Sequence, residues 1–558
     1  MTRRKKKWLI GLGVTAATVA IVLFLVGRSM AKRFEPYIRE QAITYLQNRF
    51  DSEAEIGTLS ISLPHLSPYK ILFERGRGTM AHVEGDNVLL RHKGRHDIAP
   101  MFVMKRFSFD VDLGTLFDSP KRVQLVVIDG MEINIPPKGQ RPDFTPDDRD
   151  DHKEKKYEQP GTDVIFDKVL INDSMLSLLP RNEGKKPLQF DLHQIQLLSA
   201  GRYVAMKYKA SLTNAKPPGE IDSEGNFGPW AATEPGDTPL DGDYVFDKAD
   251  LGVFRGIAGI LHSTGKFEGT LDEITAKGEA TVPDFRLKKP GHRVPLKTKF
   301  EVLVDGTNGN TVLKPVIGTL GTTTFTTSGA VLKHEDEHHR TISLDVDMPR
   351  GNLRDLLTLA MKGEPFMAGQ IALKTKIDIP PLSGSVKEKL LLDGRFEITE
   401  GHFLKSKIQD KIDELSRRAQ GQPKNMEIDE VVMNMAGAFK LDDQTITFKN
   451  LSFAVPGSGV DLAGNYDIDQ DVIDFRGTLK LDAKISQTLT GWKHWLAKPI
   501  DPFFSKNGAG TFVHIQVTGS SKDPKFGREK GSKDKDEDKE AEKDKDKDKK
   551  KIRDKGGH

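Results

Sequence analysis

Apolar residues recur at every second position through most of this chain, which is the spacing of half-buried β-strands. The pattern is clear in residues 58–63 and 107–113. It continues through residues 123–135, where Asp129-Gly130 interrupts it as a turn or bulge signal. Strands are therefore expected to dominate the chain from residue 58 onwards.

A short unit recurs in the second half of the chain, in which a large apolar residue follows two positions after a glycine. It occurs at Gly265, Gly394, Gly437, Gly464 and Gly477. We interpret each glycine as part of the turn that opens a strand. The spacing of the units is too irregular for a propeller or a solenoid, so the repetition favours one extended, meandering sheet.

Two segments have helical spacing instead. Residues 34–50, with Pro36 in the first turn, form an amphipathic pattern. Residues 404–421 carry an apolar stripe that ends at Gly421, a residue typical of helix C-termini. We predict a helix at each place.

A third helical stripe combines leucine with two of the four tryptophans of the chain: Leu489, Trp492, Trp495 and Leu496. Capping the open end of a sheet is one interpretation. Contact with a membrane interface or a partner is the other, since tryptophan favours that zone. These four residues form a candidate interface helix.

The first fifty residues indicate a membrane anchor. Residues 8–27 are uncharged and long enough to span a hydrocarbon core of roughly 30 Å as a helix. A cleaved signal peptide is the alternative, with Ser29-Met30-Ala31 as the cleavage site, but its apolar region would normally be shorter. Basic residues are more numerous before the span than after it, which predicts a cytoplasmic N-terminus and an exported body.

Together these patterns predict a mainly β fold: an N-terminal transmembrane helix followed by an elongated, antiparallel, groove-forming β-sheet with a few short helices. Residues 136–162 are charged and proline-rich, and the end of the chain is almost wholly Lys, Asp and Glu. The predicted divisions are a cytoplasmic segment (1–7), the anchor (8–27), an N-terminal β region with its leading helix (31–135), a flexible charged loop (136–162), a C-terminal β region (163–520) and a disordered charged tail (521–558).

Composition narrows the possible functions. Lys plus Arg (84) nearly equals Asp plus Glu (81), and the net charge of +3 gives no reason to expect a nucleic-acid partner. The chain has no cysteine, which excludes thiolate catalysis, cysteine-ligated metals and disulfides.

Several motifs with possible metal chemistry are present. Residues 334–338 match the zinc-peptidase pattern H-E-x-x-H, but strand-like segments flank them, so we expect a hairpin loop and no helix. Residues 467–471 begin like a calcium loop, but Val472 stands where that loop requires glycine. Alternating carboxylates such as Asp110 and Asp112 are expected on the solvated face of a strand. We predict no catalytic residue, no metal and no cofactor, and therefore no enzyme.

The anchor, the amphipathic helix and the strand Ala54–Leu63 resemble the beginning of AsmA-like proteins of the Gram-negative envelope. The segments 107–113 and 127–135 resemble the strand order of that family, and 437–481 with the strand ending at Gly519 resembles its C-terminal region. The resemblance implies an inner-membrane protein, single-pass, with a periplasmic body that handles phospholipid or another envelope lipid in an apolar β-groove. Possible further partners are outer-membrane or periplasmic assembly proteins.

Candidate lipid-facing residues of such a groove are the apolar positions of the alternating segments. They are Leu59, Ile61, Leu63, Phe107, Phe109, Val111, Val123, Leu125, Val127, Phe396, Ile398, Phe439 and Leu441. A lipid conduit requires this apolar face to be continuous along the sheet. The alternative, a non-catalytic scaffold or assembly factor for outer-membrane proteins, requires only a closed core with a polar exterior.

Overall fold

The computed structural model describes residues 52–62, 80–112, 121–136, 164–180, 186–333, 340–381, 385–424, 430–483 and 511–528, with residues 39–47 in part and short gaps at 93, 202–203, 230, 232–233, 290–291 and 521–522. The chain forms two compact units. Unit 1 comprises Met1–Ala249 and His262–Thr275, and unit 2 comprises Asp250–Leu261 and Ala276–His558. The fold is mainly β, as predicted, with few short helices among the described residues.

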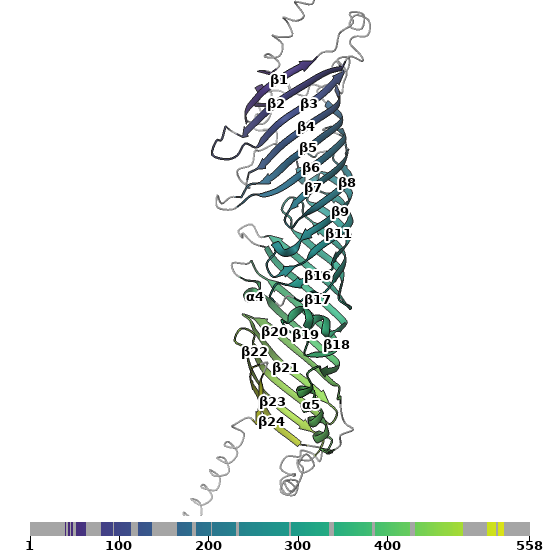
Figure 1. The fold of residues 1–558 in the computed structure, drawn as a ribbon, viewed down its shortest axis with the longest axis vertical. Coiled ribbons are helices and arrows are strands. Elements are labelled where there is room, and N and C mark those ends of the chain that lie inside the picture. Colours follow the sequence, from purple (N-terminus) through teal and green to yellow (C-terminus); the bar gives the residue numbers. More distant parts are fainter. Residues whose placement is uncertain are drawn as a thin grey trace, which may run out of the picture. The chain divides into compact units, whose positions relative to one another are not determined.

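Unit 1 is a meander in which each strand pairs with its neighbours in sequence (Figure 1). Its elements are β1 (Ser52–Ser62), β2 (Met80–His92), β3 (Phe102–Asp112), β4 (Lys121–Ile135), β5 (Val164–Leu178), β6 (Leu188–Ala200), β7 (Met206–Ala215), β8 (Pro218–Phe227), the 3-10 helix η2 (Pro235–Asp237) and β9 (Pro239–Asp250). The next strands, β11 (Ile260–Thr270) and β12 (Glu273–Val282), have residues in both units.

One pairing in unit 1 departs from the predicted antiparallel arrangement. Strands β4 and β5 pair in parallel, with Lys121 opposite Val164 and Ile135 opposite Leu178. A parallel pair needs a crossover connection of about a dozen residues or more. The charged segment 136–162 provides that length, although residues 137–163 lie outside the described part of the chain.

Unit 2 is a second meander, and all of its pairings from β14 to β25 are antiparallel. Its strands are β14 (Leu296–Val304), β15 (Thr311–Leu320), β16 (Thr323–Lys333), β17 (Arg340–Asn352), β18 (Met367–Ile379), β19 (Leu391–Phe403), β20 (Met433–Asp442), β21 (Thr445–Val455), β22 (Ser458–Asp467), β23 (Val472–Leu481), β24 (Thr511–Gly519) and β25 (Pro524–Arg528). Strand β25 pairs with β24 and lies inside the predicted tail 521–558, so any tail begins after it.

Three α-helices are described in unit 2: α3 (Leu353–Ala360), α4 (Val386–Lys389) and α5 (Ser406–Ala419). The helix predicted over residues 404–421 is confirmed as α5, and Gly421 follows it with a φ of 74°. Helix α3 was not predicted from the sequence. Asn352 caps its N-terminus by accepting a hydrogen bond from the backbone N–H of Arg354, and asparagine is a residue typical of that position. Of the predicted helix 34–50, residues 39–40, 43–44 and 46–47 are described, and they are helical.

The interpretation of the recurring glycines as turn residues is wrong. Gly394, Gly437, Gly464 and Gly477 each lie inside a strand and are paired on both sides. Gly265 likewise lies within β11. At Gly394, Gly437 and Gly464, a phenylalanine lies directly opposite on a neighbouring strand, as described below.

Candidate functional site: apolar sheet faces

Unit 2 presents one continuous apolar face across strands β17 to β24. Residues that lie directly opposite each other on paired strands share a face. The register therefore places three rows on this face: Met348, Leu373, Phe396, Leu451, Leu462 and Ile515; Val346, Phe439, Phe448, Phe475 and Val517; and Leu344, Ile377, Leu392, Leu441, Ile446, Tyr466 and Ile473. Most of these side chains are only partly buried.

Four phenylalanine rings form the centre of this face, and we call them the phenylalanine cluster: Phe396, Phe439, Phe448 and Phe475. Phe396 lies 6.1 Å from Phe439 and 6.3 Å from Phe448, and Phe448 lies 5.7 Å from Phe475, measured between ring centroids. Aromatic pairs at such separations contribute about 0.5–1.5 kcal/mol beyond area burial.

Glycine makes these contacts between rings possible. Phe396 lies opposite Gly437 and Phe439 lies opposite Gly394, so each ring covers a position without a side chain. Gly464 on β22 lies between Phe448 and Phe475, and the two rings meet across it. The glycine repeat in the sequence therefore provides the space into which the phenylalanine rings of this face pack.

The opposite face of the same strands is polar and charged. Lys374 on β18 forms an ion pair with Asp347 on β17 at 2.7 Å, and Arg395, Lys440 and Asp461 are exposed. Ion pairs of this kind on a solvated surface contribute little to stability, but they make that face soluble. The sheet of unit 2 therefore has one charged, solvent-exposed face and one apolar face.

Two shallow hollows are lined by charged residues together with apolar atoms. One, of about 460 Å³, lies between Lys209, Glu224 and Asp243, and the other, of about 620 Å³, lies between Asp345, Lys374 and Arg395. Neither is an enclosed cavity of the kind that buries most of a ligand. The candidate site is accordingly the apolar face and not either hollow.

Helices α3 and α5 cover one border of the apolar face. Beneath them lies a sealed core of Met348, Leu353, Met367, Ile371, Ile398, Val431, Met433 and Val455. Ile398, one of the predicted lipid-facing residues, is only 6% exposed because it belongs to this core. The phenylalanine cluster lies farther along the strands, where its rings remain partly exposed apart from Phe475, which is buried.

Buried polar groups hold α5 in place. The carboxylate of Asp413, which is 1% exposed, accepts hydrogen bonds from Gln409 Nε2 at 2.8 Å and from the backbone N–H of Val431 at 3.0 Å. Ser416 Oγ donates to the carbonyl of Pro456 at 2.9 Å. These residues were not among the predicted site residues, although polar residues at positions i, i+4 and i+7 on the apolar side of a helix are a usable signal.

Unit 1 has an apolar face of its own. Leu59, Phe107, Ile128, Ile171 and Ile195 form one row across β1 to β6 through Gly85, which lies opposite Phe107. The next row contains Ile61, Val83, Phe109, Val126, Val169 and Leu197, and the rings of Phe107 and Phe109 stack at 6.2 Å.

The register separates two predicted groove residues from this face. Val127 lies opposite Ser108 and Leu125 lies opposite Asp110, so both point to the other side from Phe107 and Phe109. A bulge between Asp110 and Val111 restores Val123 to a position opposite Val111. Because four consecutive residues of β4 are apolar, the alternation pattern by itself does not assign each of them to one face of the sheet.

A polar row on the other face of unit 1 runs in register across six strands. It consists of Thr58, Asp86, Arg106, Asp129, Asn172 and Gln194. Asp86 accepts a hydrogen bond from Thr58 and pairs with Arg106, and Asn172 Nδ2 donates to Asp129 at 3.0 Å. The two faces of unit 1 thus differ in the same way as those of unit 2.

A small ribbon of unit 2 lies between helices α3 and α4, and we call it the strap. It consists of residues 250–260 and 284–289, which include η3 (Leu251–Val253), β10 (Ile257–Ala258) and β13 (Arg286–Leu287). Strand β13 contacts α3, and a methyl group at Gly256 would lie 3.4 Å from Val386 of α4. The strap thus joins α3, whose Leu353, Leu356 and Leu357 belong to or pack against the apolar core, to α4 at the other end of β18.

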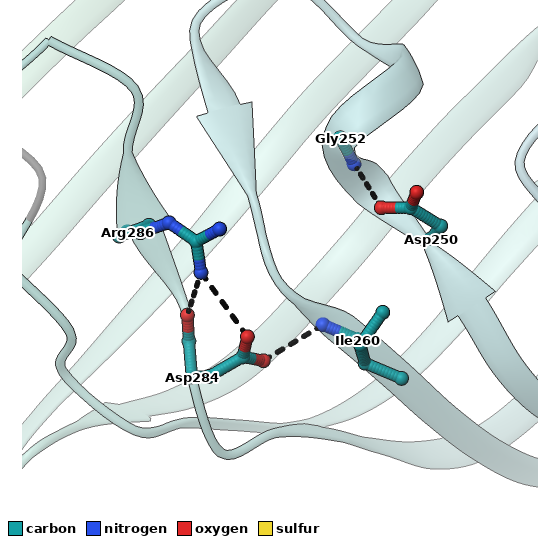
Figure 2. A network of polar contacts seen from close by, with 5 residues as sticks. All are labelled: Asp250, Gly252, Ile260, Asp284 and Arg286. Atoms are coloured by element: carbon teal, nitrogen blue, oxygen red, sulfur yellow. Dashed lines mark hydrogen bonds and ion pairs between the residues drawn. The ribbon is translucent and has the colours of Figure 1, made fainter.

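Hydrogen bonds within the strap fix its shape, as Figure 2 shows. Asp284 accepts a hydrogen bond from the backbone N–H of Ile260 at 2.7 Å and one from Arg286 Nη1 at 3.1 Å. These contacts hold the pKa of Asp284 below its usual range, with the Ile260 N–H as the largest cause. Asp250 accepts from the N–H of Gly252 at 2.7 Å and starts η3.

Hydrogen bonds within the chain engage the carboxylates of the turn at 467–471, which begins like a calcium loop in sequence. Asp467 accepts hydrogen bonds from the backbone N–H groups of Asp469 and Gln470, and Asp469 bonds to Lys387 Nζ at 2.8 Å. The hydrogen bond and charge of Lys387, together with the charge of Lys289, lower the pKa of Asp469. No group of residues suited to a metal ion occurs in the described part of the chain.

Several predicted residues lie outside the described residues. These are Leu63, the candidate interface helix with Leu489, Trp492, Trp495 and Leu496, the histidine motif at 334–338 and the anchor at 8–27. Among the residues that the structure places, no helix is long and apolar enough to cross a membrane. The topology therefore stays a prediction.

No protein-family model, curated protein or solved structure matches this chain. The resemblance to AsmA-like proteins accordingly stays a prediction, and the function has to be argued from the two faces of the sheet.

Proposed function

We propose that this protein is a membrane-anchored, periplasmic lipid-handling protein of the AsmA-like type. Its apolar faces accept the acyl chains of phospholipid or another envelope lipid, for transport between inner and outer membrane or for outer-membrane biogenesis. The observation that carries the proposal is the partly exposed phenylalanine cluster on a sheet whose other face is charged. Contiguous apolar surface of this kind marks a binding surface in soluble proteins.

Acyl chains match this surface chemically. Each methylene group that leaves water contributes about 0.8 kcal/mol, so a chain gains affinity from length without needing specific hydrogen bonds. The rows of the face offer Phe, Leu, Ile and Val side chains and few polar groups, which suits such a ligand. A catalytic role has no support from any group on this face.

A scaffold function is the second candidate, because helices α3 and α5 do cover one border of the face. Two substitutions to aspartate separate the candidates. Ile398→Asp places a charge in the sealed core and should lower the free energy of unfolding by about 3–5 kcal/mol. Phe439→Asp places it where water has access and should leave the protein folded while lipid capture is lost.

The measurement is mass spectrometry of lipid that co-purifies with the full-length protein, combined with chemical denaturation. Ala438→Asp is the matched control, because it lies next to Phe439 on β20 but on the charged face. It should change neither quantity. Lipid retained in full by Phe439→Asp, or no lipid on the unmutated protein, would exclude the lipid function and favour the scaffold.

A further inference from the structure

Basic residues gather where the strap meets α4. The strap carries Lys288 and Lys289 directly after β13, and both are exposed. Lys288 Nζ donates to the carbonyl of Gly252 at 2.7 Å, and its backbone N–H donates to the carbonyl of Gly256. Gly256 in turn adjoins Val386, so the two lysines lie beside the first residues of α4.

Lys387 of α4 completes the group. Its Nζ lies 2.8 Å from Asp469 Oδ1, and Lys289 acts on the same carboxylate. Two ammonium groups, one from the strap and one from α4, thus act on a single carboxylate, which is itself 65% exposed, and Lys288 directly precedes Lys289 in the chain. An ammonium group can donate three hydrogen bonds, so these lysines retain donors for a further anion.

The position of these lysines relative to the apolar face indicates which class of ligand they would bind. The strap contacts α3, which packs on the apolar core, and lies beside α4, which leads directly into β19 with Phe396. A cationic group beside an apolar surface matches a ligand with an anionic head and acyl chains. Phosphate is the anion that lysine commonly binds as a point charge.

We propose that Lys288, Lys289 and Lys387 form a binding site for the phosphate of a lipid headgroup, whose acyl chains lie on the adjoining apolar face. This inference rests on the proposed lipid function and names its ligand class, an anionic phospholipid. Asp469 competes with that phosphate for the same lysines. The site therefore predicts opposite effects for removing the lysines and for removing the aspartate.

The test measures capture of two photoactivatable lipids with identical chains, phosphatidic acid and diacylglycerol, by the full-length protein in neutral detergent. The unmutated protein should capture phosphatidic acid about tenfold better, and added salt should reduce the difference, because exposed charges are screened. The double variant Lys288→Gln/Lys289→Gln should lose this preference and keep its capture of diacylglycerol. Asp469→Asn should increase the preference, which a purely structural role of these residues would not do.

The control is Lys297→Gln/Lys299→Gln, two exposed lysines of β14 that should leave capture unchanged. Equal capture of both lipids by the unmutated protein would overturn the headgroup site and leave the lipid function standing. Binding of inorganic phosphate to the same lysines as tightly as phosphatidic acid would assign the site to free phosphate and overturn the proposal. Capture of neither lipid would overturn the proposed function itself.

Discussion

At the residue scale, a phenylalanine next to a glycine on the neighbouring strand is a recurring contact of these strands. Phe107 lies over Gly85, Phe325 over Gly318 and Phe396 beside Gly437, in each case on a neighbouring strand. Glycine weakens a strand by its conformational entropy and lack of a side chain. A ring that covers the bare backbone offsets this cost, and it places the aromatic surface on one face.

Gly464 lies close to the backbone of the next strand. A Cβ at this position would lie 2.1 Å from the carbonyl oxygen of Asp474, which is too close for any real contact. We expect Gly464→Ala to lower the free energy of unfolding by about 1–3 kcal/mol, measured by chemical denaturation. Gly459→Ala on the same strand meets nothing within 4 Å and should have little effect. Equal stability of the two variants would contradict the close approach of Asp474 as the reason for glycine at position 464.

Asp284 provides a pH-dependent test of the strap. Its pKa in the folded protein is lowered, chiefly by the N–H of Ile260, so it stabilises the fold above the unfolded pKa, and this stability is lost as the pH falls through the folded pKa. Asp284→Asn should therefore reduce the free energy of unfolding at pH 7. The difference from the unmutated protein should shrink below the unfolded pKa of roughly 3.9.

Denaturation curves at pH 7 and pH 3 measure this difference. Asp461→Asn, on the charged face, is the control and should have the same small effect at both values. A deficit of Asp284→Asn that persists undiminished at pH 3 would contradict the assignment of the stability to the ionised carboxylate.

At the element scale, α5 is held in place by buried hydrogen bonds in addition to the apolar contacts of an amphipathic helix. Asp413, Gln409 and Ser416 connect it to the segment around Val431 and to the turn at Pro456. The backbone N–H of Val431 and one N–H of Gln409 Nε2 lose their acceptor if Asp413 is removed. The helix therefore acts as a fixed cover over the core that contains Ile398.

We expect Asp413→Ala to lower the free energy of unfolding by about 2–3 kcal/mol, since the backbone N–H of Val431 would be left unpaired and Gln409 would lose one of its two acceptors. Asp410→Ala, an exposed position of the same helix, should change it by less than about 0.5 kcal/mol. Thermal or chemical denaturation distinguishes the two. A neutral Asp413→Ala would mean that apolar contacts alone hold α5.

At the scale of the whole molecule, the absence of cysteine makes topology accessible to single introduced thiols. We expect a cysteine at Ser521 to react with a membrane-impermeant reagent from the periplasmic side and one at Thr2 to be protected. The physical reason is the excess of basic residues before the predicted span, which favours retention of the N-terminus in the cytoplasm. Labelling of Thr2 without labelling of Ser521 would reverse the predicted orientation.

The sequence by itself determined the fold class, the meander, the helix α5 and the presence of one apolar side on most strands, because these follow from local periodicity. Only the tertiary structure decided the rest. Register assigned Leu125 and Val127 to the side away from Phe109, since one bulge reverses the faces of a strand. It also showed that β4 and β5 pair in parallel, that the glycines lie beneath phenylalanine, and that Ile398 is sealed in a core. Pairing, packing and the meeting of distant lysines depend on contacts between segments far apart in sequence, which no local pattern records.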